Sequence, residues 1–123
     1  MSYELFFEDV LIGKIKYEAN DFPNLFGDIA FSSEYLTSNS SKVRRIRDYL
    51  NLQAQSVELV EVENEKDVEK ELNEMNAKLD QYMDMVETNG WCLISDKGEQ
   101  LPILSPIIRT DGEVTWRWNI VKM

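Results

Sequence analysis

The stretch that decides the fold runs from Lys42 to Asn89 and reads KVRRIRDYLNLQAQSVELVEVENEKDVEKELNEMNAKLDQYMDMVETN. It contains neither glycine nor proline, and its apolar residues recur at steps of three and four. The first series is Val43, Ile46, Leu50, Ala54 and Val57, and the second is Val68, Leu72, Met75, Leu79, Tyr82 and Val86. Each series forms one stripe along a helix, so the stretch predicts two amphipathic helices. Met85 falls off the second stripe, and we expect it to be exposed.

Acidic residues occupy every second position between the two stripes, from Glu61 to Glu71. In a helix they form like-charged pairs four residues apart, each costing about a few tenths of a kcal/mol. The pattern therefore predicts a helix break near residues 61–65, with one continuous helix as the alternative. A calcium loop does not fit, because Lys66 stands where the turn needs glycine and Leu72 where a bidentate glutamate closes the site.

Alternating and apolar runs on both sides of this stretch predict strands. The runs are Tyr3–Phe7, Leu11–Tyr17 and Leu25–Phe31 before it, and Trp91–Ser95, Leu101–Ile108 and Val114–Val121 after it. Gly98 and Gly112 mark turns between the later strands, where a positive φ favours glycine. Pro102 and Pro106 cannot donate ladder hydrogen bonds, so Leu101–Ile108 should be irregular or lie at an edge.

Smaller features interrupt the early strands. Gly27 breaks the third run, and its neighbour Asp28 indicates a bulge there. The polar segment 32–41 predicts a loop that holds one helical turn at residues 33–36.

The order of three strands, two helices and three strands indicates an α+β fold. We expect a single domain over residues 1–123, with the two helices packed on one face of a mainly antiparallel sheet of about six strands.

The chain has no histidine and a single cysteine, Cys92. These absences exclude the Ser/His/Asp and Cys/His nucleophile pairs and the HExxH zinc site. Cys92 lies in an apolar run and is expected to pack as a small hydrophobic residue. We therefore favour a binding protein over an enzyme, and we expect no cofactor and no metal.

The net charge of −10 is concentrated in residues 61–90, which carry 3 basic and 10 acidic groups. Such a field repels nucleic acids and anionic membranes and attracts a basic protein. The first residues do not resemble an export signal, and no apolar run approaches the roughly 20 residues that span a bilayer. We expect a cytoplasmic protein.

The first functional hypothesis is a non-enzymatic protein that docks a basic partner through an acidic helical edge. The candidate residues are Glu61, Glu63, Glu65, Asp67, Glu71 and Glu74. By analogy of charge alone, the role is that of an inhibitor or immunity-type protein, whose negative patch covers a positive cleft.

The alternative is a small-molecule-binding or carboxylate-based enzymatic domain. Its pocket would lie between sheet and helices or on the helix-free face of the sheet, lined by Arg109, Asp111, Arg117 and Asn119. Alternation puts Trp116 and Trp118 on the core face of the last strand and places Arg117 and Asn119 on the other face. Self-association across the irregular strand or the open face is a third possibility.

Four basic residues, Lys42, Arg44, Arg45 and Arg47, stand at the start of the first helix. The macrodipole disfavours cations at this end of a helix. If the two helices are antiparallel, the end of the second helix lies beside them, so we predict ion pairs between these residues and Asp80, Asp84 and Glu87.

Overall fold

A computed structural model describes residues 2–21, 23–60, 65–86, 88 and 90–119. The strands are β1 (Ser2–Phe7), β2 (Val10–Asp21), β3 (Asn24–Phe31), β4 (Trp91–Ser95), β5 (Gln100–Pro102), β6 (Ile107–Ile108) and β7 (Glu113–Trp116). The helices are α1 (Ser33–Thr37), α2 (Ser41–Val60), α3 (Glu65–Leu79), the 3₁₀ turn η1 (Asp80–Tyr82) and α4 (Met83–Val86). The helical turn expected at residues 33–36 is present as α1, capped by Ser32, whose Oγ accepts from the Tyr35 N–H at 3.0 Å.

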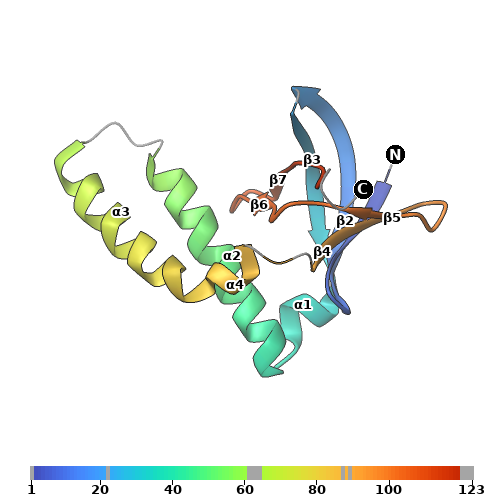
Figure 1. Cartoon of the computed structure of the whole chain (residues 1–123), viewed down its shortest axis with the longest axis horizontal. Helices are drawn as coiled ribbons and strands as arrows, with labels where there is room; N and C mark the ends of the chain where they lie inside the picture. The colour runs from blue at the N-terminus through green and yellow to red at the C-terminus, as the bar shows by residue number, and fades with distance from the viewer. Residues whose placement is uncertain (1, 22, 61–64, 87, 89, 120–123) are drawn as a thin grey trace.

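The strands form one antiparallel sheet in the order β5-β4-β1-β2-β3-β7-β6 (Figure 1). The predicted α+β class with an antiparallel sheet is confirmed. The described residues hold seven strands, one more than expected, because the run Leu101–Ile108 splits in two. Its first part pairs with β4 as β5, and its last part pairs with β7 as β6 at the opposite end of the order.

The segment between β5 and β6 links the two ends of the sheet. Ile103 bridges Trp118, and the Leu104 N–H donates to the Arg117 carbonyl at 3.0 Å. The Ile103 N–H also donates to the Trp91 carbonyl, at 3.2 Å. One short segment therefore touches strands that lie far apart in the sheet order, which requires the sheet to be strongly curved.

The bulge predicted at Asp28 lies on the neighbouring strand instead. The pairing of β2 with β3 shifts between Tyr17 and Ala19, whereas β3 pairs continuously through Gly27 and Asp28. A side chain at Gly27 would collide with the Lys16 carbonyl oxygen. Gly27 thus permits close approach of the two strands rather than breaking one of them.

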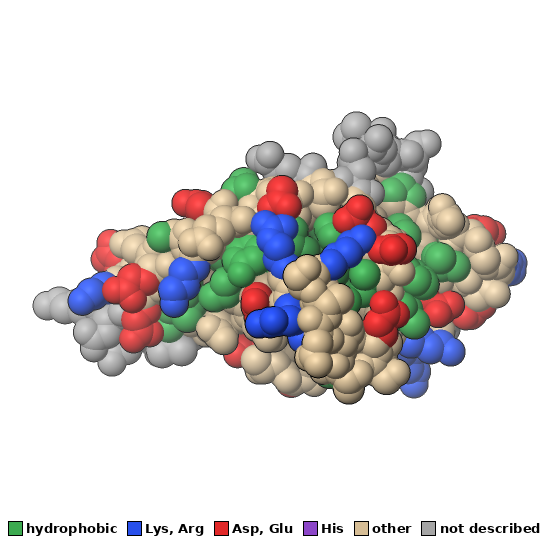
Figure 2. Space-filling model, turned by 90° about the horizontal axis from the view of Figure 1, so that it is seen from below, with side chains coloured by type: hydrophobic (Ala, Val, Ile, Leu, Met, Phe, Trp, Pro, Cys, Tyr) green, Lys and Arg blue, Asp and Glu red, His purple; other side chains and the backbone are tan. Residues whose placement is uncertain are grey.

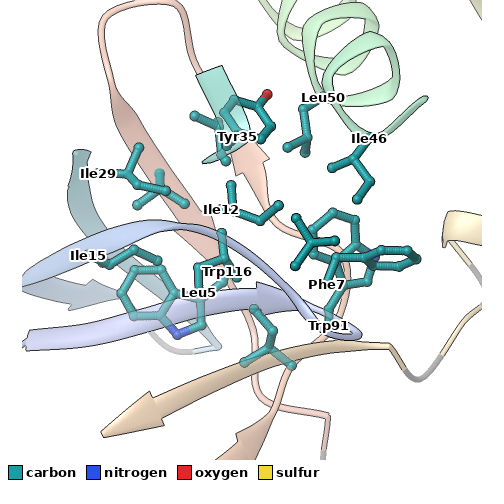
Figure 3. Close-up of a cluster of buried hydrophobic side chains, with 14 of the residues drawn as sticks. Leu5, Phe7, Ile12, Ile15, Ile29, Tyr35, Ile46, Leu50, Trp91 and Trp116 are labelled. Atoms are coloured by element: carbon teal, nitrogen blue, oxygen red, sulfur yellow. The ribbon is translucent and has the colours of Figure 1, made fainter. Parts of the chain in front are cut away.

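The core lies between the concave face of the sheet and α2. Figure 3 shows side chains from β1, β2 and β4 pointing toward Ile46 and Leu50 of α2. The predicted stripe of α2 is buried at Val43, Ile46, Leu50 and Ala54, and Tyr49 is fully buried beside it. On the sheet, Leu5, Ile12, Ile15, Trp91, Leu93 and Val114 are completely enclosed.

The second long helix, α3, packs against α2 and lies on the side of α2 that faces away from the sheet (Figure 1). This contact confirms two separate helices, although residues 61–64, where the break was expected, lie outside the described part. Leu72, Met75 and Leu79 of the stripe are half-buried, and no described side chain of α3 is fully buried. Of this pair, α2 supplies the fully buried residues of the core, whereas α3 reaches it through the half-buried Leu79.

Met85 corrects a prediction. It is 1% exposed, whereas Val86, predicted to lie on the stripe, is 41% exposed. The cause is η1, because a 3₁₀ turn has about 3.0 residues per turn rather than 3.6 and advances the following side chains around the axis. The shift turns Met85 into the core, where its carbonyl accepts from the Trp91 Nε1–H at 2.8 Å.

Candidate protein-binding surface

The structure describes the side chains of only part of the predicted acidic edge. Glu71 and Glu74 are exposed on α3, as is their neighbour Glu69. Glu65 and Asp67 belong to the first turns of α3, but their side chains fall outside the described part, and Glu61 and Glu63 lie outside it entirely. Glu69 was not among the candidate residues, although it belongs to the same alternating run as Glu65 and Asp67.

Helix geometry arranges the acids of α3 on two flanks. At about 100° per residue, Glu69 lies on one side of the apolar stripe, while Glu71 and Glu74 lie on the other. Lys70 projects between the two flanks, and Lys78 falls on the flank of Glu74, one turn further along. Figure 2 shows this mixture as red and blue side chains next to one another at the helical end of the molecule. The surface of α3 is therefore acidic with lysines interspersed, rather than one unbroken negative edge.

An ion pair joins α2 to the end of the second helix, as predicted. Arg45 donates from Nη1 and Nη2 to the two carboxylate oxygens of Asp84, each at 2.7 Å, and from Nη2 to the Gln81 carbonyl at 2.9 Å. The guanidinium also lies 5.1 Å from the centre of the Tyr82 ring. The hydrogen bonds from Arg45 lower the pKa of Asp84, and the same pairing raises the pKa of Arg45.

The other basic residues of the cluster find different partners. Lys42 donates to Asp9 Oδ1 at 2.7 Å in the turn between β1 and β2, and its Nζ lies 3.7 Å from Glu8 Oε1. Arg47 donates to the Tyr35 carbonyl at 2.9 Å. The predicted pairing thus holds for Arg45 with Asp84, whereas Glu87, the other predicted partner on this end, lies outside the described residues. The partners of Lys42 and Arg47 come close only through the fold, so no spacing in the sequence indicates them.

A groove of about 320 Å³ opens between α2, α3 and α4. Tyr49, Gln53 and Val57 of α2 line one side, and Leu79, Met83 and Val86 line the other. Asn76 and Asp80 add polar groups to its rim. Met83 and Val86 are among the four large apolar side chains that the described residues leave exposed.

The residues proposed for the alternative ligand face do not meet. Arg109 and Asp111 lie in the turn between β6 and β7, whereas Arg117 follows β7 and donates from Nε to Asn24 Oδ1 at 2.7 Å. The four residues of β7 separate these two places by about 13 Å at the usual rise of a strand. Asn119, expected on the solvent face, is buried, because β7 ends at Trp116 and the chain then bridges Ile103.

The turn between β6 and β7 is tied to α2 by a residue that sequence reasoning did not single out. Glu58 Oε1 accepts from the Thr110 N–H at 2.9 Å and from the Thr110 hydroxyl at 2.7 Å. These hydrogen bonds lower the pKa of Glu58. Glu58 acts as a structural link, because both of its described contacts hold one loop.

Titratable groups in the described part show no arrangement typical of catalysis. Burial raises the pKa of Tyr35 to about 12 and raises the pKa of the half-buried Cys92 thiol, which makes both poorer nucleophiles at neutral pH. In the ranges that the structure describes, no group of three or more Asp, Glu or Cys residues is placed to bind a metal ion. No described helix is long and apolar enough to cross a membrane.

Comparison of the chain with protein-family models, with curated proteins and with solved structures found no match.

Proposed function

We propose that this chain is a non-enzymatic binding protein that docks a basic protein partner on its acidic helix α3. The observation that carries the proposal is the placement of α3. It contacts α2 on the side away from the sheet and keeps Glu69, Glu71 and Glu74 in solvent. A helix that adds little to the core while presenting carboxylates is suited to recognition.

Electrostatics gives this surface its specificity. A negative surface speeds the approach of a positive partner and discriminates against acidic ones, and both effects weaken as salt screens the charges. The concentration of acids in residues 61–90 makes this segment the one that attracts a basic partner. The proposal places the protein in the cytoplasm, where a chain with one cysteine needs no disulfide.

The test is capture of partners from a lysate of the native cells on three immobilised proteins. They are the natural chain, the variant E69K/E71K/E74K, and the control D21K/D96K/E99K, which makes the same change in charge at exposed residues outside α3. We expect the natural chain and the control to retain the same stoichiometric basic protein and release it at high salt. The α3 variant should not retain it. Equal retention by all three proteins would contradict the proposal.

A further inference from the structure

We propose that the groove between α2, α3 and α4 receives a basic amphipathic helix of the partner, with an apolar side chain inserted between Met83 and Val57. This inference rests on the proposed function and adds the chemistry of the segment that binds. It draws on three features of the groove: its apolar walls, an unsatisfied hydrogen-bond acceptor, and carboxylates along one rim.

The walls of the groove suit an apolar anchor. Met83 and Val86 are 42% and 41% exposed, so both leave apolar surface in water that a partner can cover. Tyr49 and Leu79 continue this apolar lining inward. A volume of about 320 Å³ is at the lower end of the range for ligand pockets and accommodates one or two large side chains.

Gln53 supplies an acceptor that the fold leaves unused. Its Oε1 is enclosed and has no hydrogen-bond partner in the described part of the chain. Such an atom costs free energy unless it is paired. Gln53 lines the groove and is only half-buried, and its side chain also hydrogen-bonds Tyr49, which lines the groove beside it. An anchor whose N–H reaches Oε1, such as tryptophan or arginine, would satisfy this atom.

The carboxylates explain why the bound segment is basic and helical. Asp80 lines the groove. Glu69 stands eleven residues earlier, about three helical turns, and therefore on the same side of α3. At the helical rise of 1.5 Å per residue, the two carboxylates form a row of about 16 Å along the helix axis. A helix lying along it pairs lysines or arginines three turns apart with this row while its apolar face enters the groove.

The experiment uses a fluorescent peptide of about 18 residues, built from leucine and lysine at helical spacing with one central tryptophan, and a scrambled peptide of the same composition. Fluorescence anisotropy gives the affinity of the natural chain, of the groove variant M83E/V86E and of the control L36E/L104E. Leu36 and Leu104 are exposed apolar residues that do not line the groove, at 58% and 46% exposure. Both double variants add two negative charges, which by themselves strengthen binding of a cationic peptide.

We expect the groove variant to bind the helical peptide about tenfold or more weakly than the natural chain, because hot-spot contacts dominate such interfaces. The control should bind at least as well as the natural chain, and the scrambled peptide should bind more weakly to both. Undiminished binding by the groove variant, equal binding of the scrambled peptide, or no binding at all would overturn the inference.

The variant E69K/E71K/E74K separates this inference from the proposed function. If it loses affinity for the peptide and for the captured partner while M83E/V86E keeps both, the acidic helix docks the partner and the groove does not. If M83E/V86E weakens both, the groove is part of the docking site. If neither variant loses affinity for the partner, both proposals are wrong.

Discussion

The sheet with α2 and the outer helix α3 differ in what their side chains do. Strand β1 alternates between fully enclosed residues such as Leu5 and residues that face solvent, and α2 buries its whole predicted stripe as far as Ala54. In α3 the stripe residues Leu72, Met75 and Leu79 are only half-buried. The first region accounts for most of the apolar burial and hence most of the stability. The second region is therefore freer to evolve a binding surface.

The largest expected effect is in the first region. Trp91 is fully buried, its ring centre lies 4.6 Å from that of Phe7, and its Nε1–H donates a hydrogen bond to the Met85 carbonyl. Replacing it with alanine should lower the free energy of unfolding by about 3–5 kcal/mol, because a large cavity forms. Urea denaturation measures this value. A loss below about 1 kcal/mol, within the range of surface substitutions, would mean that β4 is not part of the core.

The next largest effect tests whether η1 turns Met85 inward and Val86 outward. Met85→Ala should cost about 2–5 kcal/mol as a buried methionine, whereas the neighbouring Val86→Ala should change the free energy of unfolding by less than about 0.5 kcal/mol. Each variant serves as the control for the other. The reverse order would show that the stripe predicted from sequence, with Val86 inward, is correct.

A smaller effect on stability is expected from the ion pair that joins α2 to the end of the second helix. The side chains of Arg45 and Asp84 are 43% and 65% exposed, so solvent weakens their ion pair although its geometry is bidentate. D84K should lower the melting temperature slightly, and the swapped variant R45D/D84K should regain part of the loss. An unchanged melting temperature in D84K would show that the pair adds nothing to stability.

The smallest expected effects on the free energy of unfolding come from the protonation of single carboxyl groups as the pH falls. Hydrogen bonds from Lys42, Arg45 and Thr110 lower the pKa of Asp9, Asp84 and Glu58. A carboxyl whose pKa is lower in the folded state stabilises the fold above its unfolded pKa, and the gain is lost as pH falls through the folded pKa.

We therefore expect the free energy of unfolding to fall as the pH drops below about 4. Glu18 acts in the opposite direction, because a hydrogen bond with Asp28 raises its pKa and protonation relieves their repulsion. Urea denaturation across this pH range measures the balance. Stability that rises on acidification would mean that the repulsive pair outweighs the three stabilised carboxylates.

Local patterns predicted much of the fold. The stripes at Val43–Val57 and Leu72–Tyr82 depend on neighbours in sequence, so they could be recognised without the structure. The same holds for the alternation of β1 and of Val114–Trp116, although the predicted strand Val114–Val121 ends as β7 at Trp116. The turns at Gly98 and Gly112 were also recognisable, and both glycines adopt positive φ values of 81° and 92°. The ion pair between Arg45 and Asp84 was predictable, because antiparallel packing places the start of the first helix beside the end of the second.

The remaining features depend on contacts between distant segments. The separation of β5 from β6, the bond from Thr110 to Glu58 and the burial of Asn119 follow from the curvature of the sheet, which no local pattern encodes. The groove likewise needs α2 and α4 to converge. Gln53 carried no signal in sequence, since a glutamine on a helix is ordinarily a solvated residue.

The most direct test of the account is hydrogen exchange measured by mass spectrometry on the protein alone and bound to the basic partner captured from the lysate. We predict that binding slows exchange in residues 69–86, which hold the described acids of α3 and the α3 and α4 walls of the groove, and leaves β1 and β2 unchanged. Slowed exchange confined to the turn of Arg109 and to Arg117, with residues 69–86 unaffected, would contradict the account and favour the sheet as the binding surface.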